Sequence, residues 1–317
     1  MLAQHHGYRL SPVGVFTILI GMNEMHRSIV RETHHRERLE LTPQPTGIAP
    51  NYHHLPDIRA VLFDIYGTLL ISGSGDVGTA VKRSRSLPFK KALIDGGIQD
   101  PDEAIVEQAE RLLFEKIQAD HETSRSAGID FPEVDILSIW KEVLTGLGYR
   151  SDEQTVVRIA ASYESAVNPV CIMPGSIKSV TGLRDAGFLL GIVSNAQFYT
   201  PILLEYELGM NLADAGFDNR LCSFSYIAGA AKPSKAIFKP VLDILYKTRS
   251  ISPEQVLYVG NDMLNDIYTA SIAGCRTCLF AGDQRSLRMR KDHDLITDLS
   301  ADGVITELSQ LLEITTL

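Results

Sequence analysis

Cysteine is scarce in this 317-residue chain, and its longest apolar stretch near the N-terminus is short. Four cysteines (Cys171, Cys222, Cys275 and Cys278) are too few and too scattered for a disulfide framework, which favours a reducing compartment. The last two form a C-x-x-C pair, but without a second cluster we interpret them as small buried residues. Residues 13–22 are too short to cross a bilayer with a hydrocarbon core of ~30 Å, and their flanks lack an export signal. We therefore expect a cytoplasmic protein without a membrane partner.

Positively charged residues are also fewer than negatively charged ones. The chain has 30 Lys and Arg residues against 39 Asp and Glu residues, a formal net charge of −9. Such a surface repels nucleic acid and anionic membranes as a whole, although a local basic patch can still bind one small anion. Together with 44% hydrophobic residues, the length allows a substantial core and two folding units, and leaves the oligomeric state open.

Histidine is concentrated at the N-terminus, followed by a proline-rich passage at 42–56. Seven of the nine histidines precede residue 57: His5, His6, His26, His34, His35, His53 and His54. Paired histidines can bind a metal, but no cysteine or acidic residue stands at ligand spacing, which favours a solvated or partly helical arm. We therefore predict that residues 1–56 form a His-rich extension.

From Ile58 onward, short apolar runs alternate with longer helical patterns. This alternation predicts an α/β fold with a doubly wound parallel sheet. Polar residues follow the runs, and the carboxyl ends of parallel strands meet at one edge of a sheet. We therefore expect Asp64, Ser194 and the Asn261-Asp262 pair to lie close together. The strand-like runs are 60–63, 189–193, 256–259 and 277–280.

About a hundred residues between the first two runs have helical periodicity, at 103–120, 134–147 and 153–167. Such an insertion is too long for a loop, and we predict a smaller helical cap domain at 75–173, over a core formed by 57–74 and 174–317. Trp140 is expected to fill the core of this cap rather than to stack on a ligand. A basic cluster at its start either grips an anion or is a solvated helix face, which we favour. The cluster comprises Lys82, Arg83, Arg85, Lys90 and Lys91.

Four short motifs accompany the predicted strands. An apolar strand ends at Asp64 in Phe63-Asp64-Ile65-Tyr66-Gly67-Thr68, and a second delivers Ser194 and Asn195 to the same edge. Each alone is also explained by turn or helix capping. A third motif, Ala231-Lys232-Pro233, is placed to open a helix with Pro233 in its first turn. The fourth, Gly260-Asn261-Asp262-Met263-Leu264-Asn265-Asp266, places two acids four residues apart, so that a helical turn brings both carboxylates to one side.

In their order and joint occurrence, these motifs resemble those of the haloacid dehalogenase superfamily, over residues 58–317. The resemblance implies that Asp64 is a covalent nucleophile oriented by Thr68, and that Ser194 and Lys232 are catalytic. It implies substrate contacts from Tyr66, Ser194, Asn195 and Lys232. A Mg²⁺ ion would be held by Asp64, the Tyr66 carbonyl and Asp262, with Asp266 as a direct or indirect partner. The substrate is expected to be a phosphate ester or another small anion.

Tyr66 departs from the family's phosphatases, in which this position is a second Asp that acts as general acid and base. Positioned proton transfer is typically worth about 10²- to 10⁴-fold in rate. The Asp-x-Tyr-Gly-Thr form resembles the family's metal-free 2-haloacid dehalogenases, whose leaving halide needs no proton. Those enzymes carry Ser-x-Asn-x-x-Asp in the fourth motif, whereas this chain has Met263 at the Asn position and keeps Asp262.

Three hypotheses therefore remain open. The leading one is a Mg²⁺-dependent phosphoester hydrolase with an aspartyl-phosphate on Asp64. The second is a metal-independent 2-haloacid dehalogenase-type hydrolase, in which Tyr66 replaces the general acid. The third is a weakly active or non-catalytic protein that binds a phosphorylated ligand or a partner.

Overall fold

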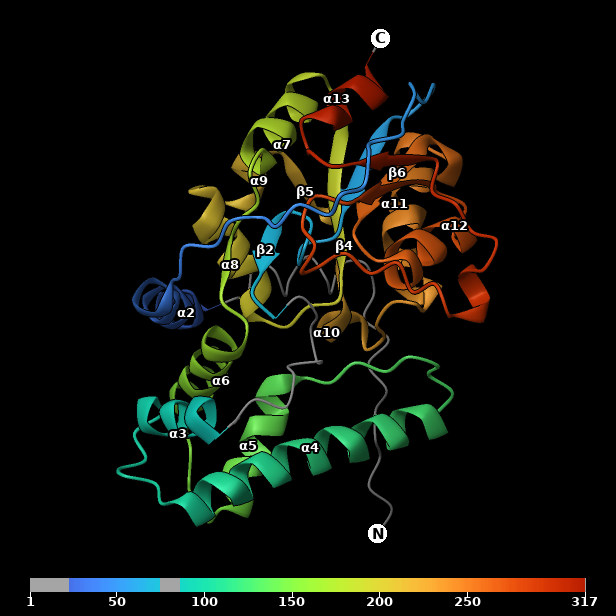
Figure 1. Ribbon diagram of the computed structural model, residues 1–317. Helices are drawn as coiled ribbons and strands as arrows, with labels where there is room; N and C mark the ends of the chain where they lie inside the picture. The colour runs from blue at the N-terminus through green and yellow to red at the C-terminus, as the bar shows by residue number, and fades with distance from the viewer. Residues whose placement is uncertain (1–22, 75–85, 317) are drawn as a thin grey trace.

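A six-stranded parallel sheet forms the centre of the molecule. The computed structural model describes residues 23–74 and 86–316. The strand order is β5-β4-β1-β6-β7-β8, and every neighbouring pair is parallel (Figure 1). The strands are β1 (Ala60–Phe63), β4 (Leu189–Ser194), β5 (Phe217–Phe224), β6 (Val256–Gly260), β7 (Arg276–Phe280) and β8 (Gly303–Ile305). The predicted α/β fold with a doubly wound parallel sheet is confirmed.

Strand β1 is central and fully buried because its side chains are apolar on both faces. Val61 and Phe63 belong to one hydrophobic cluster, whereas Ala60 and Leu62 belong to another. Phe63 is in register with Ile192 of β4 and Val259 of β6. The chain order reverses on either side of β1, so its carboxyl end opens at the crevice where α/β sheets bind ligands.

Helices cover both faces of the sheet. Those on one side include α7 and α13, which contribute Val180 and Leu311 to the cluster of Phe63, whereas α11 contributes Val241 to the cluster of Leu62. Short 3-10 turns and one π-helix, η3, complete the core. The helical segments are α7 (Ser176–Asp185), α8 (Tyr199–Leu208), α9 (Leu212–Ala215), α10 (Ser225–Ala228), η1 (Lys235–Ile237), α11 (Lys239–Arg249), η2 (Pro253–Gln255), η3 (Met263–Tyr268), α12 (Thr269–Ile272), η4 (Asp294–Ile296) and α13 (Gln310–Thr315).

Four helices form a separate layer beyond one edge of this core (Figure 1). We call α3 to α6 the helical insertion: α3 (Ser86–Asp95), α4 (Glu103–Ser126), α5 (Ile136–Gly146) and α6 (Glu153–Val167). A two-stranded antiparallel ladder of β2 (Leu70–Ser72) and β3 (Val170–Ile172) joins it to the core. Trp140 packs against the rings of Phe89 and Tyr163 within the insertion, as predicted.

The expected basic cluster is only partly visible, because Lys82, Arg83 and Arg85 lie outside the described residues. Lys90 lies 3.8 Å from Asp100, and Lys91 forms ion pairs with Asp95 and Glu37. Neither of these two lysines lines the cavity that contains Asp64. Both therefore belong to a surface ion-pair network, in keeping with the solvated alternative.

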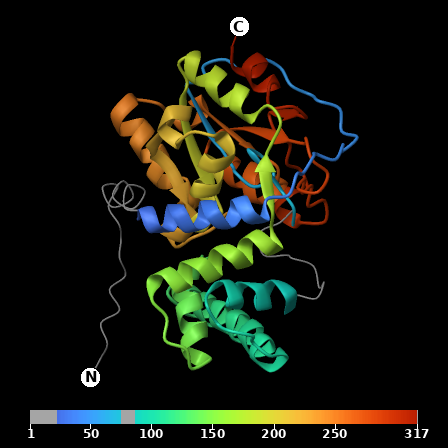
Figure 2. The same cartoon turned by 90° about the vertical axis from the view of Figure 1, so that its left-hand side faces the viewer.

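Within the predicted N-terminal extension, the described residues 23–56 contain one helix, as expected for a partly helical arm, but this helix packs on the rest of the structure. Helix α2 (Glu24–Glu37) packs against both α6 and α8 and lies between the insertion and the core (Figure 2). One face buries Ile29 and Val30, and His34 is also buried, where its Nε2 donates to the Glu207 carboxylate at 2.7 Å. Apolar residues on that face explain the packing, because a helix buries its apolar stripe against a neighbour. The boundaries 1–56, 57–74, 75–173 and 174–317 stay predictions.

Several elements differ from the sequence-based expectation. Strands β5 and β8 carry no strong apolar run and were not predicted. Pro233 precedes η1 rather than lying in a first helical turn, and α11 begins only at Lys239. All four cysteines are buried and free, and no helix among residues 23–74 and 86–316 is apolar enough over a sufficient length to cross a bilayer.

Candidate active site

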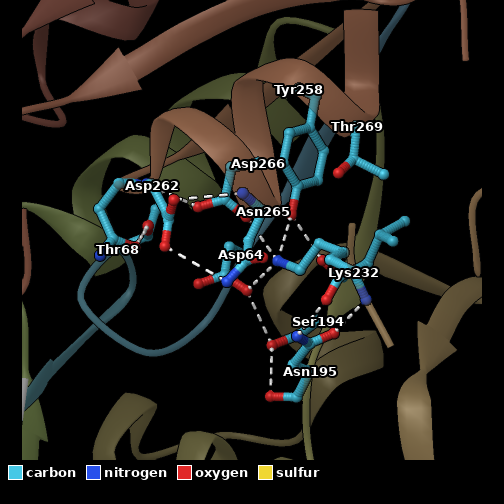
Figure 3. A network of polar contacts seen from close by, with 12 residues as sticks. Asp64, Thr68, Ser194, Asn195, Lys232, Tyr258, Asp262, Asn265, Asp266 and Thr269 are labelled. Carbon is cyan, nitrogen blue, oxygen red and sulfur yellow. Dashed lines mark hydrogen bonds and ion pairs between the residues drawn. The ribbon is translucent and has the colours of Figure 1, made fainter. Parts of the chain in front are cut away.

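Asp64 lies directly after β1, at the carboxyl edge of the sheet, and is 6% exposed. Its backbone N–H donates to the Val259 carbonyl at 2.9 Å, which continues the ladder with β6. The carboxylate oxygen Oδ1 accepts hydrogen bonds from Ser194 Oγ at 2.9 Å and Lys232 Nζ at 2.6 Å (Figure 3). The second oxygen, Oδ2, accepts no hydrogen bond from the described residues. One oxygen is therefore held in place while the other stays available for chemistry.

Lys232 connects three motifs through its buried ammonium group. Nζ donates to Asp64 at 2.6 Å, to Asp266 at 2.5 Å and to the Tyr258 hydroxyl at 2.8 Å. Burial alone would lower the pKa of Lys232, but the adjacent carboxylates of Asp266 and Asp64 outweigh it and raise the pKa above its ordinary value. Lys232 is therefore a permanent cation beside Asp64.

Asn195 fixes the backbone of Lys232. Its Oδ1 accepts from the Lys232 backbone N–H at 2.7 Å, and its Nδ2 donates to the Lys232 carbonyl at 3.2 Å. This paired contact joins the loop after β4 to the loop before η1. Asn195 also lines the cavity described below. Its observed contacts position Lys232, in addition to the substrate contact predicted for it.

Asp266 is buried at 1% exposure, with hydrogen bonds to both carboxylate oxygens. Oδ2 accepts from the backbone N–H groups of Asn261 and Asp262 at 2.9 Å each, and Oδ1 accepts from Lys232 and Tyr258. Burial raises the pKa of Asp266 to about 7, against the opposing attraction of Lys232. This arrangement favours an indirect role for Asp266, as the group that orients Lys232.

Gly260 makes this inward position of Asp266 possible. A Cβ atom on residue 260 would lie 2.3 Å from Cγ of Asp266. Because real Cβ atoms essentially never approach so closely, only glycine leaves room for the carboxylate beneath the end of β6. Any side chain at position 260 would therefore displace the Asp266 carboxylate.

The two acids of the fourth motif bind different partners. Asp262 caps the N-terminus of the π-helix η3, whereas Asp266 lies within it. Asp262 is the N-cap of η3 and accepts from the Leu264 N–H at 2.8 Å. Its carboxylate also accepts from Arg290 Nη2 at 2.7 Å. The expected α-helical spacing is replaced by η3, so Asp262 stays at the crevice while Asp266 turns back toward Lys232.

Thr68 is completely buried, but its hydroxyl donates to Asn261 Oδ1 at 3.1 Å rather than to Asp64. It ties the loop after β1 to the loop after β6. Any orientation of Asp64 by Thr68 is therefore indirect. That Thr68 orients the nucleophile Asp64 therefore stays a prediction, with Asn261 as the contact of its hydroxyl.

Tyr66 directs its hydroxyl to Thr200 Oγ1, 3.0 Å away. Burial, reinforced by the charge of Glu164, raises the pKa of Tyr66 well above its ordinary value. The phenol is therefore neutral at physiological pH and unsuited to act as a base. Its position in the same crevice as Asp64 agrees with the predicted substrate contact.

A cavity of about 420 Å³ opens between the sheet edge and the helical insertion. Core residues at one end include Asp64, Tyr66, Asn195, Lys232 and Asp262. The other end is formed by side chains of α4, α5 and α6. Ser194 and Thr68 stand behind Asp64 and do not line the cavity.

Three further groups at the site carry no clear sequence signal. The sequence predicts Tyr258 only as an aromatic residue of a buried strand, but its hydroxyl contacts Lys232 and Asp266. Arg290 follows β7 outside the four motifs, yet pairs with Asp262. Glu164 in α6 is buried in the cavity wall, and burial raises the pKa of its carboxyl group. In the sequence, the only indication of a role for Glu164 is that it is an acid within the predicted helix 153–167.

The oxygen donors at the crevice fit a Mg²⁺ ion. No group of three or more His, Cys, Asp or Glu side chains in the described ranges is arranged to hold a metal. Mg²⁺, however, is commonly held by one or two carboxylates together with water and substrate oxygens. Asp64 and Asp262 both line the cavity and are carboxylates of this kind, although Asp262 is paired with Arg290. The predicted ligand set of Asp64, Asp262 and the Tyr66 carbonyl stays a prediction.

The family model of haloacid dehalogenase-like hydrolases matches residues 58–274, more than half of the chain. The chain belongs to this family. It is therefore a hydrolase by family, with the α/β core that the motifs predicted. This match includes all four motifs around Asp64.

Among curated proteins, this family member is similar to the glyceraldehyde 3-phosphate phosphatase of Pyrococcus furiosus, at 32% identity over 142 residues. The alignment covers 45% of the chain and 53% of the relative, so the chain spans about half the length of that relative.

Solved structures agree in fold. A 2-haloacid dehalogenase from Pseudomonas syringae matches with a TM-score of 0.51 at 23% identity, covering 81% of this chain and 97% of the other. A phosphatase of the same family from Thermococcus onnurineus matches with a TM-score of 0.47 at 20% identity, with the same coverage, 81% and 97%.

Proposed function

We propose that this protein is a Mg²⁺-dependent phosphoester hydrolase in which Asp64 attacks phosphorus and forms an aspartyl-phosphate. The observation that carries the proposal is the arrangement of the Asp64 carboxylate. Ser194 and Lys232 hold Oδ1, whereas Oδ2 accepts no hydrogen bond from the described residues, and Asp64 lines the cavity. A carboxylate held in this way is oriented for nucleophilic attack.

Charge compensation supports the same reaction. A phosphate monoester brings negative charge next to Asp64, and the buried Lys232 ammonium offsets it. Asp266 and Tyr258 keep this ammonium in place, so no reorganisation is needed when the ester binds. As the bond between Asp64 and phosphorus forms, the P–O bond to the alcohol breaks, and the alcohol leaves with a proton taken from water. A second water then attacks the aspartyl-phosphate, the bond between Asp64 and phosphorus breaks, and inorganic phosphate leaves while the Asp64 carboxylate is restored.

Mg²⁺ would be held by Asp64, the Tyr66 carbonyl and Asp262, and would supply further charge neutralisation for the phosphoryl oxygens. Asn195, which lines the cavity, would contact those oxygens, and Lys232 would stabilise them through its charge because its three N–H donors are already bound. The predicted substrate contact of Ser194 would be indirect, because Ser194 does not line the cavity and donates to Asp64. In this proposal residues 75–173 act as a cap that closes the site against bulk water. The substrate is a small molecule.

A second candidate, halide release from a 2-haloacid, is favoured by one observation. Tyr66 stands where a phosphatase of this family has a proton donor, and its hydroxyl is bound to Thr200 with a raised pKa. A leaving halide needs no proton, so this site would not be impaired in dehalogenation.

The two functions are separated by their products. Release of inorganic phosphate from a panel of phosphomonoesters is expected with Mg²⁺, and is expected to disappear after chelation and in Asp64→Asn. Chloride release from 2-chloropropionate without metal, with no ester cleaved, would replace the proposal by the dehalogenase reaction. A protein that binds esters and converts neither compound would instead be a binding protein.

A further inference from the structure

The chain between α4 and α5 lies on the side of the helical insertion that faces the core (Figure 1). We call residues 131–136, which lead into α5, the docking segment, and residues 229–234, between α10 and η1, the lysine loop. The two are joined by an antiparallel β-bridge, beside which the Ala231 N–H donates to the Phe131 carbonyl at 2.7 Å. Because Lys232 directly follows Ala231, the docking segment is bonded to the chain beside Lys232.

Gln197 binds the docking segment from a second loop, residues 195–198 after β4, which we call the β4 loop. Its Nε2 donates to Glu133 Oε1 at 3.1 Å and to the Val134 carbonyl at 2.9 Å. Its Oε1 accepts from the Ile136 N–H at 3.2 Å. Both N–H donors and the carbonyl oxygen of this buried amide are therefore used to hold the docking segment.

Glu133 ties the docking segment to the core by another side-chain contact. Its Oε2 accepts from Ser225 Oγ at 2.7 Å, in addition to the bond between its Oε1 and Gln197. Ser225 is completely buried at the start of α10, and its Oγ also accepts from the Ala196 N–H of the β4 loop at 2.8 Å. Hydrogen bonds to a carboxylate are stronger than those between neutral groups, so Glu133 reinforces the contact made by Gln197.

The β4 loop and the lysine loop carry the partners of Asp64. The β4 loop directly follows Ser194, and the lysine loop contains Lys232. These two side chains bind Oδ1 of Asp64, and Asn195 of the β4 loop accepts from the Lys232 backbone N–H. A misplacement of about 1 Å in a catalytic group can cost about 10²-fold in rate. Whatever holds the two loops therefore also holds the geometry of the nucleophile.

We propose that Gln197 and Glu133 are positioning residues, which dock the helical insertion onto the β4 loop and the lysine loop and so keep the partners of the Asp64 carboxylate in place. Neither residue belongs to the four sequence motifs. The inference goes beyond the proposed function, because it gives the insertion a part in holding the nucleophile. It rests on the proposed function only for the expected change in rate, since docking can be measured without turnover.

Residue-resolved amide hydrogen exchange measures this docking in the absence of substrate. Gln197→Met keeps an unbranched side chain of similar length and removes the hydrogen bonds to the docking segment. We expect exchange of the Lys232 amide to become about tenfold faster, although this N–H donates to Asn195. The Ala231 amide, which donates to Phe131, should exchange faster by a similar factor.

A Gln–Glu pair within α4 provides the matched control. Gln118 donates to Glu122 at 2.9 Å, both residues are exposed, and neither lines the cavity that contains Asp64. Gln118→Met and Glu122→Gln repeat the chemical changes made at the docking segment and the β4 loop. Both should leave exchange at Lys232 within about twofold of wild type.

Hydrolysis of p-nitrophenyl phosphate with Mg²⁺ gives the second readout. Gln197→Met should lower kcat about tenfold and change KM less than about threefold, because the nucleophile loses its orientation while the phosphoryl group can still bind. Glu133→Gln keeps the shape of its side chain and is the milder variant. For it we expect kcat to fall about fivefold and exchange at Lys232 to become about fivefold faster.

The outcomes separate this inference from the proposed function. Wild-type exchange at Lys232 and Ala231 in folded Gln197→Met would overturn the inference, and so would faster exchange with an unchanged kcat in a protein that turns over. A raised KM at unchanged kcat would also overturn it and identify Gln197 as a substrate contact. If the wild-type protein cleaves no phosphomonoester, the proposed function fails, and faster exchange in both variants but in neither control still supports the docking role. If Gln197→Met does not fold, Glu133→Gln decides by the same measurements.

Discussion

Lys232 is the residue on which the largest part of the polar network depends. Replacing it by Met leaves Asp64 and Asp266 buried without a counter-charge, which should lower the free energy of unfolding by roughly 3–5 kcal/mol. The kcat for any ester should fall by at least about 10²-fold, because the cation beside the nucleophile is lost. Urea unfolding and steady-state kinetics measure the two effects.

Lys235 provides the matched control for this change. It lies three positions along the same segment and is exposed, so Lys235→Met should alter stability by less than about 0.5 kcal/mol. Near-normal kcat in Lys232→Met would contradict the role assigned to the ammonium group, whatever its effect on stability.

The Tyr66 hydroxyl, in contrast, is expected to contribute little to proton transfer. Its pKa is raised well above the ordinary value, mainly by burial, and it is bound to Thr200. Tyr66→Phe should therefore keep kcat within about fivefold of wild type, well short of the 10²- to 10⁴-fold typical of a lost acid or base. A loss beyond 100-fold, measured at several pH values, would instead identify Tyr66 as a proton donor.

At the scale of elements, the predictable strands were those buried on both faces. A parallel strand that is buried on both faces has a continuous apolar sequence, as β1, β4, β6 and β7 have, and such a run is visible in the sequence. Strand β5 lies at the sheet edge and carries Asp218, Asn219 and Arg220, whereas β8 has only three residues. Both are specified by neighbours far away in sequence, so no local pattern indicates them.

The same distinction applies to the site. Residues that directly follow predicted strands, such as Asp64 and Ser194, were found because sheet geometry brings strand ends together. Tyr258 and Arg290 act through side-chain contacts that depend on the finished fold. The π-helical turn of η3 also separates the roles of Asp262 and Asp266, which residue spacing alone could not do.

Glu207 of α8 joins three elements and supports a prediction about acid stability. Its carboxylate accepts from His34 of α2, from Arg38, and from the Ile172 N–H of β3. Burial opposes its charge, but these hydrogen bonds outweigh burial and lower the pKa of Glu207 from 4.5 to about 2. A depressed carboxyl pKa stabilises the fold above pH 4.5, and this contribution is lost as pH falls from 4.5 toward 2.

Glu207→Gln should therefore lose about 2–3 kcal/mol of unfolding free energy at pH 7, and less at pH 3. Urea denaturation of both proteins at the two pH values measures the difference. Glu313→Gln, which removes an exposed carboxylate bonded to Tyr52, is the control and should change stability little at either pH. An equal deficit of Glu207→Gln at pH 7 and pH 3 would contradict the assigned linkage.

At the scale of the whole molecule, α2 holds the helical insertion and the core together (Figure 2). It forms an ion pair with Asp95 of α3 and a hydrogen bond with Glu153 of α6 on one side, and an ion pair with Glu205 of α8 on the other. The sulfhydryl of Cys171 in β3 donates to the Leu39 carbonyl, so the segment after α2 also contacts the ladder that joins the two parts. Residues 24–39 thus contact both parts, and we expect them to unfold cooperatively with both.

Ile29→Asn tests this conclusion, because Ile29 is 3% exposed on the buried face of α2. An uncompensated polar group there should cost roughly 2–4 kcal/mol and should weaken amide hydrogen-exchange protection in both α6 and α8. Leu39→Asn is the matched control at 55% exposure and should leave both helices protected. If Ile29→Asn exposes only residues 24–37 to exchange, α2 is a separate appendage, because the loss of its packing then does not reach the parts it contacts.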